Sequence, residues 1–353
     1  MKITRRTFVK GALSLGGSLL LPNIVSGVTG EKEPQWRPAY EISANEGQLA
    51  SRVAQAYAIF EECRLCPREC GADRLAGETG FCRASAKLVI YSANPHYGEE
   101  KSLVGRHGSG TIFFSNCNLR CVFCQNWPIA HEGRGKVISD EDLADVMLYL
   151  QKIGCHNINL VTPTHVMPNI LNATLWAHKK GLRVPLVYNT SGYESVEMLK
   201  LLDGIVDIYL PDMKFMDSSA AEIYLSGAAD YPEVGKKALL EMHRQVGRHR
   251  VDRNGTAKRG VMIRHLVMPN RVAGTEKFVQ WVAQNLSKAT YVNIMHQYHV
   301  DFKAYEYPQI RRSITAKEYL EAMRWAEQYG LTNLDPKSLA VRDFYTKHKG
   351  PQL

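Results

Sequence analysis

The sequence predicts an α/β fold built on six parallel strands. From residue 111 onward, short runs rich in β-branched and aromatic residues alternate with longer amphipathic runs, which is typical of consecutive β/α units. Polar residues follow each strand-like run at the point where it ends. Eight cysteines divide into a group of four, a group of three and a single residue. Parallel strands in this pattern form either an open, doubly wound sheet or a partial barrel.

Residues 1–30 have the features of a targeting segment, which is set aside from the fold. Paired arginines within residues 4–10 precede an uncharged apolar run over residues 11–21. This order resembles a twin-arginine signal, the bacterial export route for folded proteins. Gly, Ser, Pro and Asn interrupt the uncharged stretch between Lys10 and Glu31, which favours a signal over a permanent membrane anchor. We expect twin-arginine export machinery as a partner and a periplasmic or extracytoplasmic location, with a cytoplasmic site of action as the alternative.

Composition and charge are those of an ordinary globular protein. Hydrophobic residues make up 45% and charged residues 22% of the chain, as in domains that bury a core. The formal net charge is +9, but Lys2, Arg5, Arg6 and Lys10 lie in the signal-like segment and supply four of these charges. The basic run over residues 244–259 contains no Phe, Tyr or Trp. We therefore expect no nucleic acid partner.

A four-cysteine module precedes the strands. After a helix-like run over residues 47–63, the spacing C-x2-C-x3-C-x11-C supplies four thiolates, enough for a closed zinc or iron–sulfur site. Disulfides are disfavoured, because disulfide frameworks belong to small domains and this chain is long enough to bury a core. We expect a second metal site, either zinc or iron–sulfur, at Cys63, Cys66, Cys70 and Cys82.

The second cysteine group directly follows the first predicted strand. Cys117, Cys121 and Cys124 have the spacing C-x3-C-x2-C. Structural zinc sites and electron-carrying iron–sulfur clusters usually take four protein ligands. No further cysteine lies between Cys124 and Cys155. The triad therefore indicates an iron–sulfur cluster with one iron left open to another ligand.

The other elements are placed by periodicity and by capping residues. Residues 105–110 are glycine-rich, but they lead into a strand and lack the Gly-Lys-Ser/Thr ending, so we expect a turn and not a phosphate loop. Helices are expected over residues 140–153, with Ser139 as N-cap, and over residues 168–180 before Gly181. The six expected strands cover residues 111–115, 157–162, 185–189, 205–210, 260–266 and 291–296.

Polar strand ends are expected to form a ring at one mouth of the sheet, because parallel strands place their carboxyl ends on the same edge. His265 and Cys155 lie in or beside apolar runs and are expected in the core, whereas His296 and His299 are candidates for lining a substrate cavity. The polar strand ends are Thr162-Pro163-Thr164-His165, Asn189-Thr190-Ser191-Gly192, Asp212-Met213-Lys214, Val267-Met268-Pro269-Asn270 and His296-Gln297-Tyr298-His299.

These features together resemble the radical S-adenosylmethionine (radical SAM) superfamily, and within it the group related to pyruvate formate-lyase activating enzyme. The resemblance rests on the triad, the Gly-Ser-Gly-Thr-Ile-Phe-Phe approach to it, the Cys-Gln-Asn-Trp that ends it and the four-cysteine block. It implies a partial (β/α)6 barrel. The expected organisation is a signal segment at residues 1–30, a linker and four-cysteine module at 31–104, the partial barrel at 105–310 and a helical extension at 311–353.

The resemblance implies a 4Fe–4S cluster on the triad, whose open iron is chelated by the amino and carboxylate groups of SAM. A low-potential electron donor would reduce the cluster, and the resulting 5′-deoxyadenosyl radical would abstract hydrogen from a substrate. The group's activity suggests a partner protein that is activated or modified as that substrate. The alternative is an iron–sulfur electron-transfer protein or a zinc-stapled binding protein without SAM chemistry.

The resemblance also implies which residues contact SAM. Phe123 corresponds to the aromatic residue that contacts adenine. Relatives have Gly-Gly-Glu after the second strand, where it binds the amino group of SAM. This chain has a different sequence at that place, so the amino group is expected to contact Thr162, Thr164 or His165. Two further segments correspond to those that surround SAM and a monovalent cation in the activating enzymes, with Asn189 in place of an acid and Lys214 expected to pair with the SAM carboxylate. The residues of these two segments that we expect to contact the cofactor are Asn189, Thr190, Ser191, Asp212 and Lys214.

Overall fold

The computed structural model describes residues 36–348. The signal-like residues 1–30 lie outside the described residues, so the export signal stays a prediction. Contacts divide the chain into Met1–Trp36 and Arg37–Leu353, and the second unit holds all the described helices and strands. No helix among residues 36–348 has both the length and the apolar character needed to cross a bilayer.

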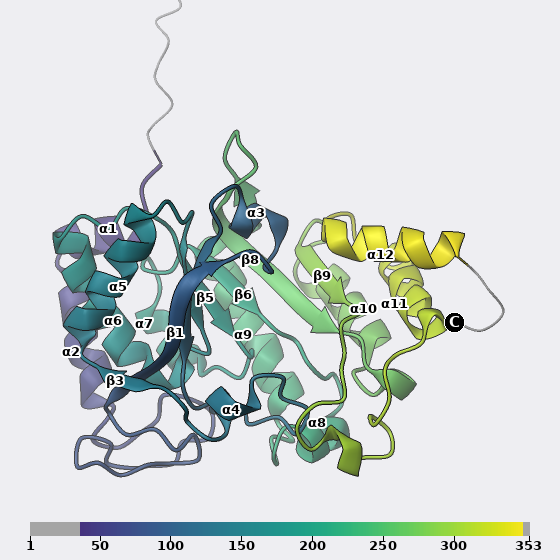
Figure 1. The fold of residues 1–353 in the computed structure, drawn as a ribbon, viewed down its shortest axis with the longest axis horizontal. Helices are drawn as coiled ribbons and strands as arrows, with labels where there is room; N and C mark the ends of the chain where they lie inside the picture. Colours follow the sequence, from purple (N-terminus) through teal and green to yellow (C-terminus); the bar gives the residue numbers. More distant parts are fainter. Residues whose placement is uncertain (1–35, 349–353) are drawn as a thin grey trace, which may run out of the picture. The chain divides into compact units, whose positions relative to one another are not determined.

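Nine strands form a sheet with a parallel centre (Figure 1). The strands are β1 (Leu88–His96), β2 (Ser109–Phe114), β3 (Lys136–Ile138), β4 (Ile158–Val161), β5 (Leu186–Thr190), β6 (Ile208–Pro211), β7 (Arg250–Val251), β8 (Ala257–Leu266) and β9 (Tyr291–Met295). Their order is β3-β1-β2-β4-β5-β6-β8-β7, and β9 also pairs with β8. The neighbours β2, β4, β5, β6, β8 and β9 are all parallel. Among the described strands β9 does not pair with β2, so the parallel part remains an open, partial barrel.

The six parallel strands are those predicted from the sequence, with ends that differ by a few residues. Three antiparallel strands were not predicted. The strand β1 does not alternate between buried and exposed residues and contains Pro95, both of which weaken a strand pattern. It pairs with β2 on one side and β3 on the other, so part of the stretch expected to be linker and module belongs to the main sheet.

Helices cover the sheet and extend it beyond β9 (Figure 1). In the figure α1, α2, α5 and α6 lie together on one side, whereas α11 and α12 lie beyond β9. The α-helices are α1 (Ala39–Asn45), α2 (Gln48–Ala58), α3 (Lys101–Val104), α4 (Trp127–Ala130), α5 (Asp140–Lys152), α6 (Met167–Lys179), α7 (Val196–Leu201), α8 (Ser218–Tyr224), α9 (Tyr231–Val246), α10 (Thr275–Asn285), α11 (Ala316–Gln328) and α12 (Pro336–Lys347). Short 3₁₀ turns are η1 (Thr164–Val166), η2 (Pro269–Arg271) and η3 (Ala304–Glu306).

Local sequence accounts for where the helices begin. Ser139 caps α5, because its hydroxyl accepts the backbone N–H of Asp142 while the Asp142 carboxylate accepts the N–H of Ser139. Thr315 and Glu318 form the same reciprocal pair at the start of α11. Such capping boxes satisfy backbone donors that the first helical turn leaves free. The predicted N-cap at Ser139 is confirmed.

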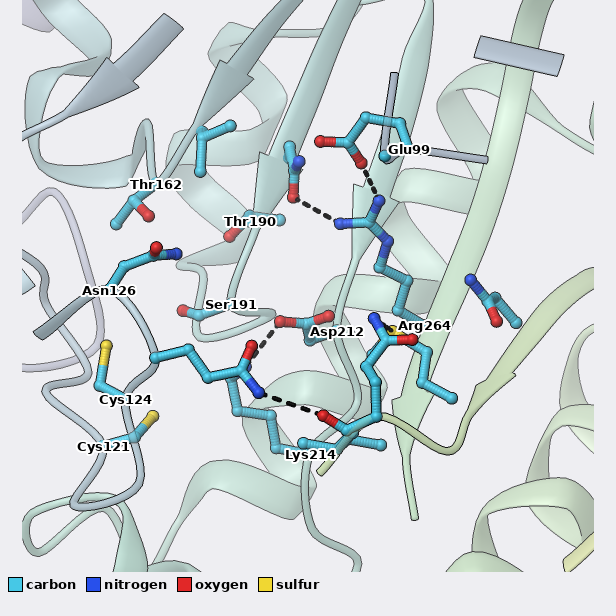
Figure 2. Close-up of a pocket in the computed structure, with 18 of the residues that line it drawn as sticks. Glu99, Cys121, Cys124, Asn126, Thr162, Thr190, Ser191, Asp212, Lys214 and Arg264 are labelled. Atoms are coloured by element: carbon cyan, nitrogen blue, oxygen red, sulfur yellow. Dashed lines mark hydrogen bonds and ion pairs between the residues drawn. The ribbon is translucent and has the colours of Figure 1, made fainter. Parts of the chain in front are cut away.

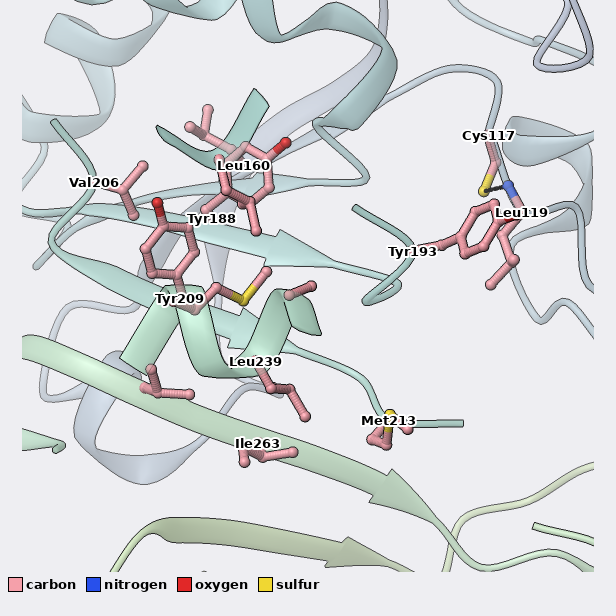
Figure 3. Packing of buried hydrophobic residues seen from close by; sticks show 14 of the residues in the cluster. Cys117, Leu119, Leu160, Tyr188, Tyr193, Val206, Tyr209, Met213, Leu239 and Ile263 are labelled. Atoms are coloured by element: carbon pink, nitrogen blue, oxygen red, sulfur yellow. Dashed lines mark hydrogen bonds between the residues drawn. The ribbon is translucent and has the colours of Figure 1, made fainter. Parts of the chain in front are cut away.

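The core lies between the parallel strands and their helices (Figure 3). Leu160, Tyr188 and Tyr209 come from successive strands β4, β5 and β6, and Leu239 of α9 packs into the same cluster. Each of these side chains is at most 1% exposed. Burial of this apolar surface is the main favourable contribution to folding.

Two residues that were predicted to lie in the core, His265 and Cys155, are buried. His265 is fully buried, with Nδ1 2.6 Å from the Met213 carbonyl oxygen and Nε2 2.9 Å from the Thr275 hydroxyl. Cys155 is 3% exposed. Both predictions are confirmed, and neither residue reaches the cavity described below.

Candidate active site

A cavity of about 470 Å³ opens at the carboxyl edge of the parallel strands (Figure 2). The three cysteines of the triad form part of its wall. Residues at or just past the ends of all the other parallel strands also line it: Thr162 after β4, Thr190 at the end of β5, Asp212 after β6, Leu266 at the end of β8 and His296 after β9. The predicted polar ring is therefore confirmed at four of the five strand ends. The prediction is wrong for β8, which contributes the apolar Leu266 and Met268 to the wall, because Asn270 turns away and its Nδ2 donates to the Gln309 carbonyl oxygen.

The triad loop is fixed by contacts to other loops. Asn118 donates from Nδ2 to the Tyr193 carbonyl oxygen at 2.9 Å, and the N–H of Val122 donates to the Tyr224 carbonyl oxygen at 3.0 Å. Asn116 and Arg120 adopt positive φ values of 74° and 54°, which tighten the loop around the cysteines. This anchoring holds the three sulfurs on one wall of the cavity.

The thiols of the triad lie in a poorly solvated environment. Burial, with a smaller effect from the charge of Cys117, raises the pKa of Cys124 to about 12. Burial also raises the pKa of Cys121, while the charge of Lys214 acts in the opposite direction. A bound metal would displace these protons and stabilise the thiolates.

Three cysteines on one loop, with an open cavity beside them, fit an iron–sulfur cluster held from one side. Within residues 36–348, no three cysteine, histidine or carboxylate side chains are drawn together as a site for a single metal ion. Binding would therefore draw the thiol side chains toward the metal.

Asp212 and Lys214 form an ion pair across from the cysteines. Lys214 Nζ lies 2.6 Å from Asp212 Oδ2. Burial lowers the pKa of Lys214, but the charges of Asp212 and Cys121 outweigh it and raise the pKa above its ordinary value. The Tyr231 hydroxyl accepts the backbone N–H of Lys214 at 2.9 Å and lies 2.8 Å from the Ser191 carbonyl oxygen. The loops after β5 and β6 are thereby tied together.

A second cation lines the far side of the cavity and was not predicted from the sequence. Arg264 of β8 donates to both Glu99 and Glu100, and its Nη1 lies 3.5 Å from Asn189 Oδ1. Burial raises the pKa of Glu100, but the charge and hydrogen bonds of Arg264 outweigh it and lower the pKa. Asn293 donates to Glu100 as well, at 2.8 Å. The one sequence signal for this cluster was that Arg264 directly follows the apolar residues Val261, Met262 and Ile263 in a predicted strand.

Most of the predicted SAM-contacting residues line the cavity, but two do not. Thr164 is 2% exposed and donates from its hydroxyl to Glu194 at 2.6 Å. His165 is also buried, with Nε2 2.7 Å from the Ser115 carbonyl oxygen. The structure thus leaves Thr162 as the member of that group at the cavity. The predicted residues in the wall are Cys117, Cys121, Phe123, Cys124, Thr162, Asn189, Thr190, Ser191, Asp212 and Lys214.

The other histidine and cysteine candidates also divide into residues that line the cavity and residues that lie outside its wall. His296 is in the cavity wall, as predicted. His299 is exposed and is absent from the wall. The four cysteines of the N-terminal module, Cys63, Cys66, Cys70 and Cys82, also lie outside the cavity wall.

Comparison with known proteins agrees with this arrangement. The profile of the radical SAM superfamily matches residues 111–225. The uncharacterized protein MJ0674 of Methanocaldococcus jannaschii is 37% identical over 293 residues, which cover 80% of this chain and 79% of that protein. The uncharacterized protein MJ0808 of the same organism is 26% identical over 200 residues, which cover 51% of this chain and 53% of that protein.

Two solved structures resemble the chain at low sequence identity. HydG, a maturase of the [FeFe]-hydrogenase, aligns with a TM-score of 0.43 and 12% identity, covering 65% of this chain and 52% of its own. TYW1 with a lysine-pyruvate adduct bound aligns with a TM-score of 0.39 and 12% identity, covering 62% of this chain and 73% of its own. This chain thus spans about half the length of HydG. On the profile match and the close relative, the chain belongs to the radical SAM superfamily and to the same family as MJ0674.

Proposed function

We propose that this protein is a radical SAM enzyme that cleaves SAM reductively and abstracts hydrogen from a partner protein. The observation that supports it best is the cavity itself, in which the cysteine triad faces the ion pair of Asp212 and Lys214. When bound, a 4Fe–4S cluster and SAM supply a one-electron cleavage that yields a 5′-deoxyadenosyl radical. A low-potential donor supplies the electron.

The residues around the cavity have the charges that a zwitterionic cofactor requires. Lys214 offers a cation for the SAM carboxylate, and Asp212 offers an anion for the amino group. Phe123 supplies an aromatic surface in the same wall for adenine. Oxygen atoms of Asp212, Asn189 and Thr190 lie at the same edge of the sheet and would also suit a monovalent cation. Because these groups are held by other side chains before any ligand binds, the site is organised in advance.

SAM cleavage is tested by anaerobic reconstitution of the full chain with iron and sulfide, reduction with dithionite and addition of SAM. We expect 5′-deoxyadenosine and methionine by chromatography. Cys121→Ala should abolish both products, whereas Cys155→Ala, a buried cysteine outside the cavity, should retain them. Cluster formation without any 5′-deoxyadenosine would instead favour an electron-transfer or binding protein.

A role like that of pyruvate formate-lyase activating enzyme is the more specific part of the proposal. It is supported by the Cys-Gln-Asn-Trp segment at the triad and by the segments after β5 and β6. Such a role requires a glycine Cα hydrogen as the one abstracted. Reaction with extract proteins that carry α-deuterated glycine should transfer deuterium to 5′-deoxyadenosine. Transfer from other labelled residues alone would reject the activating role while leaving SAM cleavage intact.

We further propose export through the twin-arginine route, on the basis of the paired arginines in residues 4–10. Fractionation of cells with an antibody to the mature chain tests this. Arg5→Lys together with Arg6→Lys should retain the protein in the cytoplasm. Wild-type protein that is found only in the cytoplasm and unprocessed would reject export.

A further inference from the structure

The four-cysteine module has little regular structure to hold it together. Residues 59–87, between α2 and β1, contain no helix or strand. Loops of this length without secondary structure are uncommon in compact domains, and small units with little core usually depend on disulfides or metals. The buried apolar residues of this stretch, apart from cysteines, are Phe60, Leu65, Ala72 and Ala84.

The thiols of the module lie near enough to influence one another's pKa, although among the described residues no three of them are yet drawn together around a single metal position. Burial, with a smaller effect from the nearby charges of Cys82 and Cys63, raises the pKa of Cys66 to about 12. Burial likewise raises the pKa of Cys82, to which the charges of Cys63 and Cys70 also contribute. A Cβ on Gly80 would lie 2.1 Å from Cys70 Sγ, so the glycine leaves the space that this sulfur occupies. We call this group, Cys63, Cys66, Cys70 and Cys82, the module thiols.

Backbone donors point at these sulfurs as they do in the triad. The backbone N–H groups of Arg68 and Ala84 act to lower the pKa of Cys66 and Cys82, respectively. The triad repeats this two-residue spacing, since the N–H of Leu119 lies 3.3 Å from Cys117 Sγ. Hydrogen bonds to the charged form favour the thiolate. Both loops therefore hold backbone donors that would stabilise thiolates once a metal has displaced the protons.

Arg74 supplies the strongest argument for negative charge at the module. Its side chain is 1% exposed, and its guanidinium carbon lies 4.4 Å from the centre of the Phe60 ring. It forms no ion pair with a carboxylate among the described residues. It donates from Nη1 to the His165 carbonyl oxygen at 2.7 Å and to Cys63 Sγ at 3.9 Å, and from Nη2 to the Ser85 carbonyl oxygen at 2.6 Å. Its Nε has no partner in the described structure. A buried charge is costly unless an opposite charge compensates it.

We propose that the module thiols bind a metal centre of their own, a zinc ion or an iron–sulfur cluster, with Arg74 as its buried counter-cation. Four thiolates carry more negative charge than a divalent ion neutralises, and the excess offsets the guanidinium. The thiol protons are released when the metal binds.

This centre also supports the active site. Arg68 donates from Nη2 to the carbonyl oxygens of Leu225 and Ser226, at 3.0 and 3.1 Å, and from Nε to that of Asn118 at 3.4 Å. Asn118 lies in the triad loop, next to Cys117. Arg74 reaches the loop after β4 through the His165 carbonyl oxygen. A metal that orders the module would therefore hold both loops in place.

The first test removes the triad and measures what metal remains. The full-length Cys117→Ser, Cys121→Ser, Cys124→Ser variant is purified anaerobically and assayed for zinc, iron and acid-labile sulfide. We expect retained metal: zinc without sulfide identifies a single ion, and iron with sulfide identifies a second cluster. Absence of both metals, in a variant that is folded by circular dichroism, would overturn the proposal. This variant lacks the SAM site, so the outcome is independent of the proposed radical chemistry.

The second test uses wild-type protein and therefore does not depend on how the triad variant folds. Cys70 is the exposed member of the module thiols, so a metal-free Cys70 should react rapidly with iodoacetamide. We expect alkylation of Cys70 in the purified protein to be at least about tenfold slower than after chelator treatment, because metal binding protects the thiolate. Equal rates before and after chelation would contradict a metal at this site.

The role of Arg74 is tested through metal affinity. Arg74→Met removes the charge but keeps a long side chain, and we expect about 10–100-fold weaker metal retention against a competing chelator. Arg74→Lys restores the charge and should recover part of the affinity. Equal affinity in the Met and Lys variants would show that Arg74 only packs and does not compensate charge.

Discussion

The ammonium nitrogen of Lys214 lies 2.6 Å from a carboxylate oxygen of Asp212. Both residues follow β6 and line the cavity that contains the triad. The charges of Asp212 and Cys121 outweigh the effect of burial and raise the pKa of Lys214, so the amine stays charged in the site. A pair of opposite charges at a cavity wall can exchange partners with the amino and carboxylate groups of a bound amino acid.

The first prediction concerns this pair. Lys214→Met leaves the partly buried Asp212 without its partner and removes the cation proposed for the SAM carboxylate. We expect at least about tenfold weaker SAM binding, since losing one partner of a charge pair at a binding site costs about 2 kcal/mol or more. Equilibrium dialysis with labelled SAM on the reconstituted protein measures this. Lys180→Met is the control, because Lys180 also forms a short pair, 2.8 Å from Asp145, at the surface. Similar SAM affinity in the two variants would count against the role of Lys214.

The second prediction concerns Arg264. Its guanidinium is the cation that faces both Glu99 and Glu100, whose side chains are 8% and 1% exposed. Arg264→Met would leave two buried carboxylates facing each other without that cation. We expect a loss of about 3–5 kcal/mol in the free energy of unfolding, measured by urea denaturation.

An arginine with the same bidentate geometry provides the control. Arg271 donates from Nε and Nη2 to Glu321 at 2.8 and 2.6 Å, but its side chain is 65% exposed. Arg271→Met should cost less than about 1 kcal/mol, because water screens exposed pairs. The interpretation of the Arg264 cluster fails if the two substitutions are equally destabilising.

The parallel strands were predictable because a strand that is buried on both faces has a continuous apolar sequence. All five residues of β5 are buried, and they form an apolar run that ends in polar residues. The triad was predictable for a different reason, since its ligands lie within one short loop. The antiparallel strand β1 has neither a continuous apolar run nor a compact motif, because its residues are partly exposed and Pro95 interrupts it.

The far wall of the cavity depends on contacts that no local pattern reveals. Arg264 and Glu100 are separated by 164 positions in the chain, and the fold alone brings them together. Thr162 and Thr164 differ for a related reason. Thr162 has a φ of 59°, after which η1 turns Thr164 toward Glu194 in the interior. A neighbouring position in the sequence was therefore a poor guide to which threonine reaches the cavity.

The third prediction concerns Gly192, at the end of the loop after β5. It has a φ of +82°, and a Cβ there would lie 2.1 Å from the Asp212 carbonyl oxygen. Gly192→Ala must therefore displace the backbone beside Lys214, and we expect roughly tenfold weaker SAM binding in equilibrium dialysis. Gly204→Ala is the control, since Gly204 has a φ of +73° with nothing within 4 Å of its added Cβ. It should cost about 1 kcal/mol in stability and leave SAM affinity unchanged.

The fourth prediction concerns the buried carboxyl of Glu194 beneath the cavity. Burial raises its pKa from 4.5 to about 7, while hydrogen bonds from Thr164, Thr190 and Tyr188 lower it. Between these two pH values the folded protein keeps a proton that the unfolded chain has released. Stability from this group is therefore complete below about pH 4.5 and is lost as the pH rises through 7. The loss amounts to about 3 kcal/mol.

Glu194→Gln should remove this part of the pH dependence, because the amide does not ionise. Urea denaturation at pH 5 and pH 8 measures it: wild-type protein should lose more stability between the two values than the variant does. Glu233→Gln is the matched control, since Glu233 is exposed and pairs with Lys236 at the surface, and it should follow the wild type. If Glu194→Gln also follows the wild type, Glu194 is already ionised in the folded protein at pH 5, and the hydroxyls of Thr164, Thr190 and Tyr188 stabilise a carboxylate beneath the cavity.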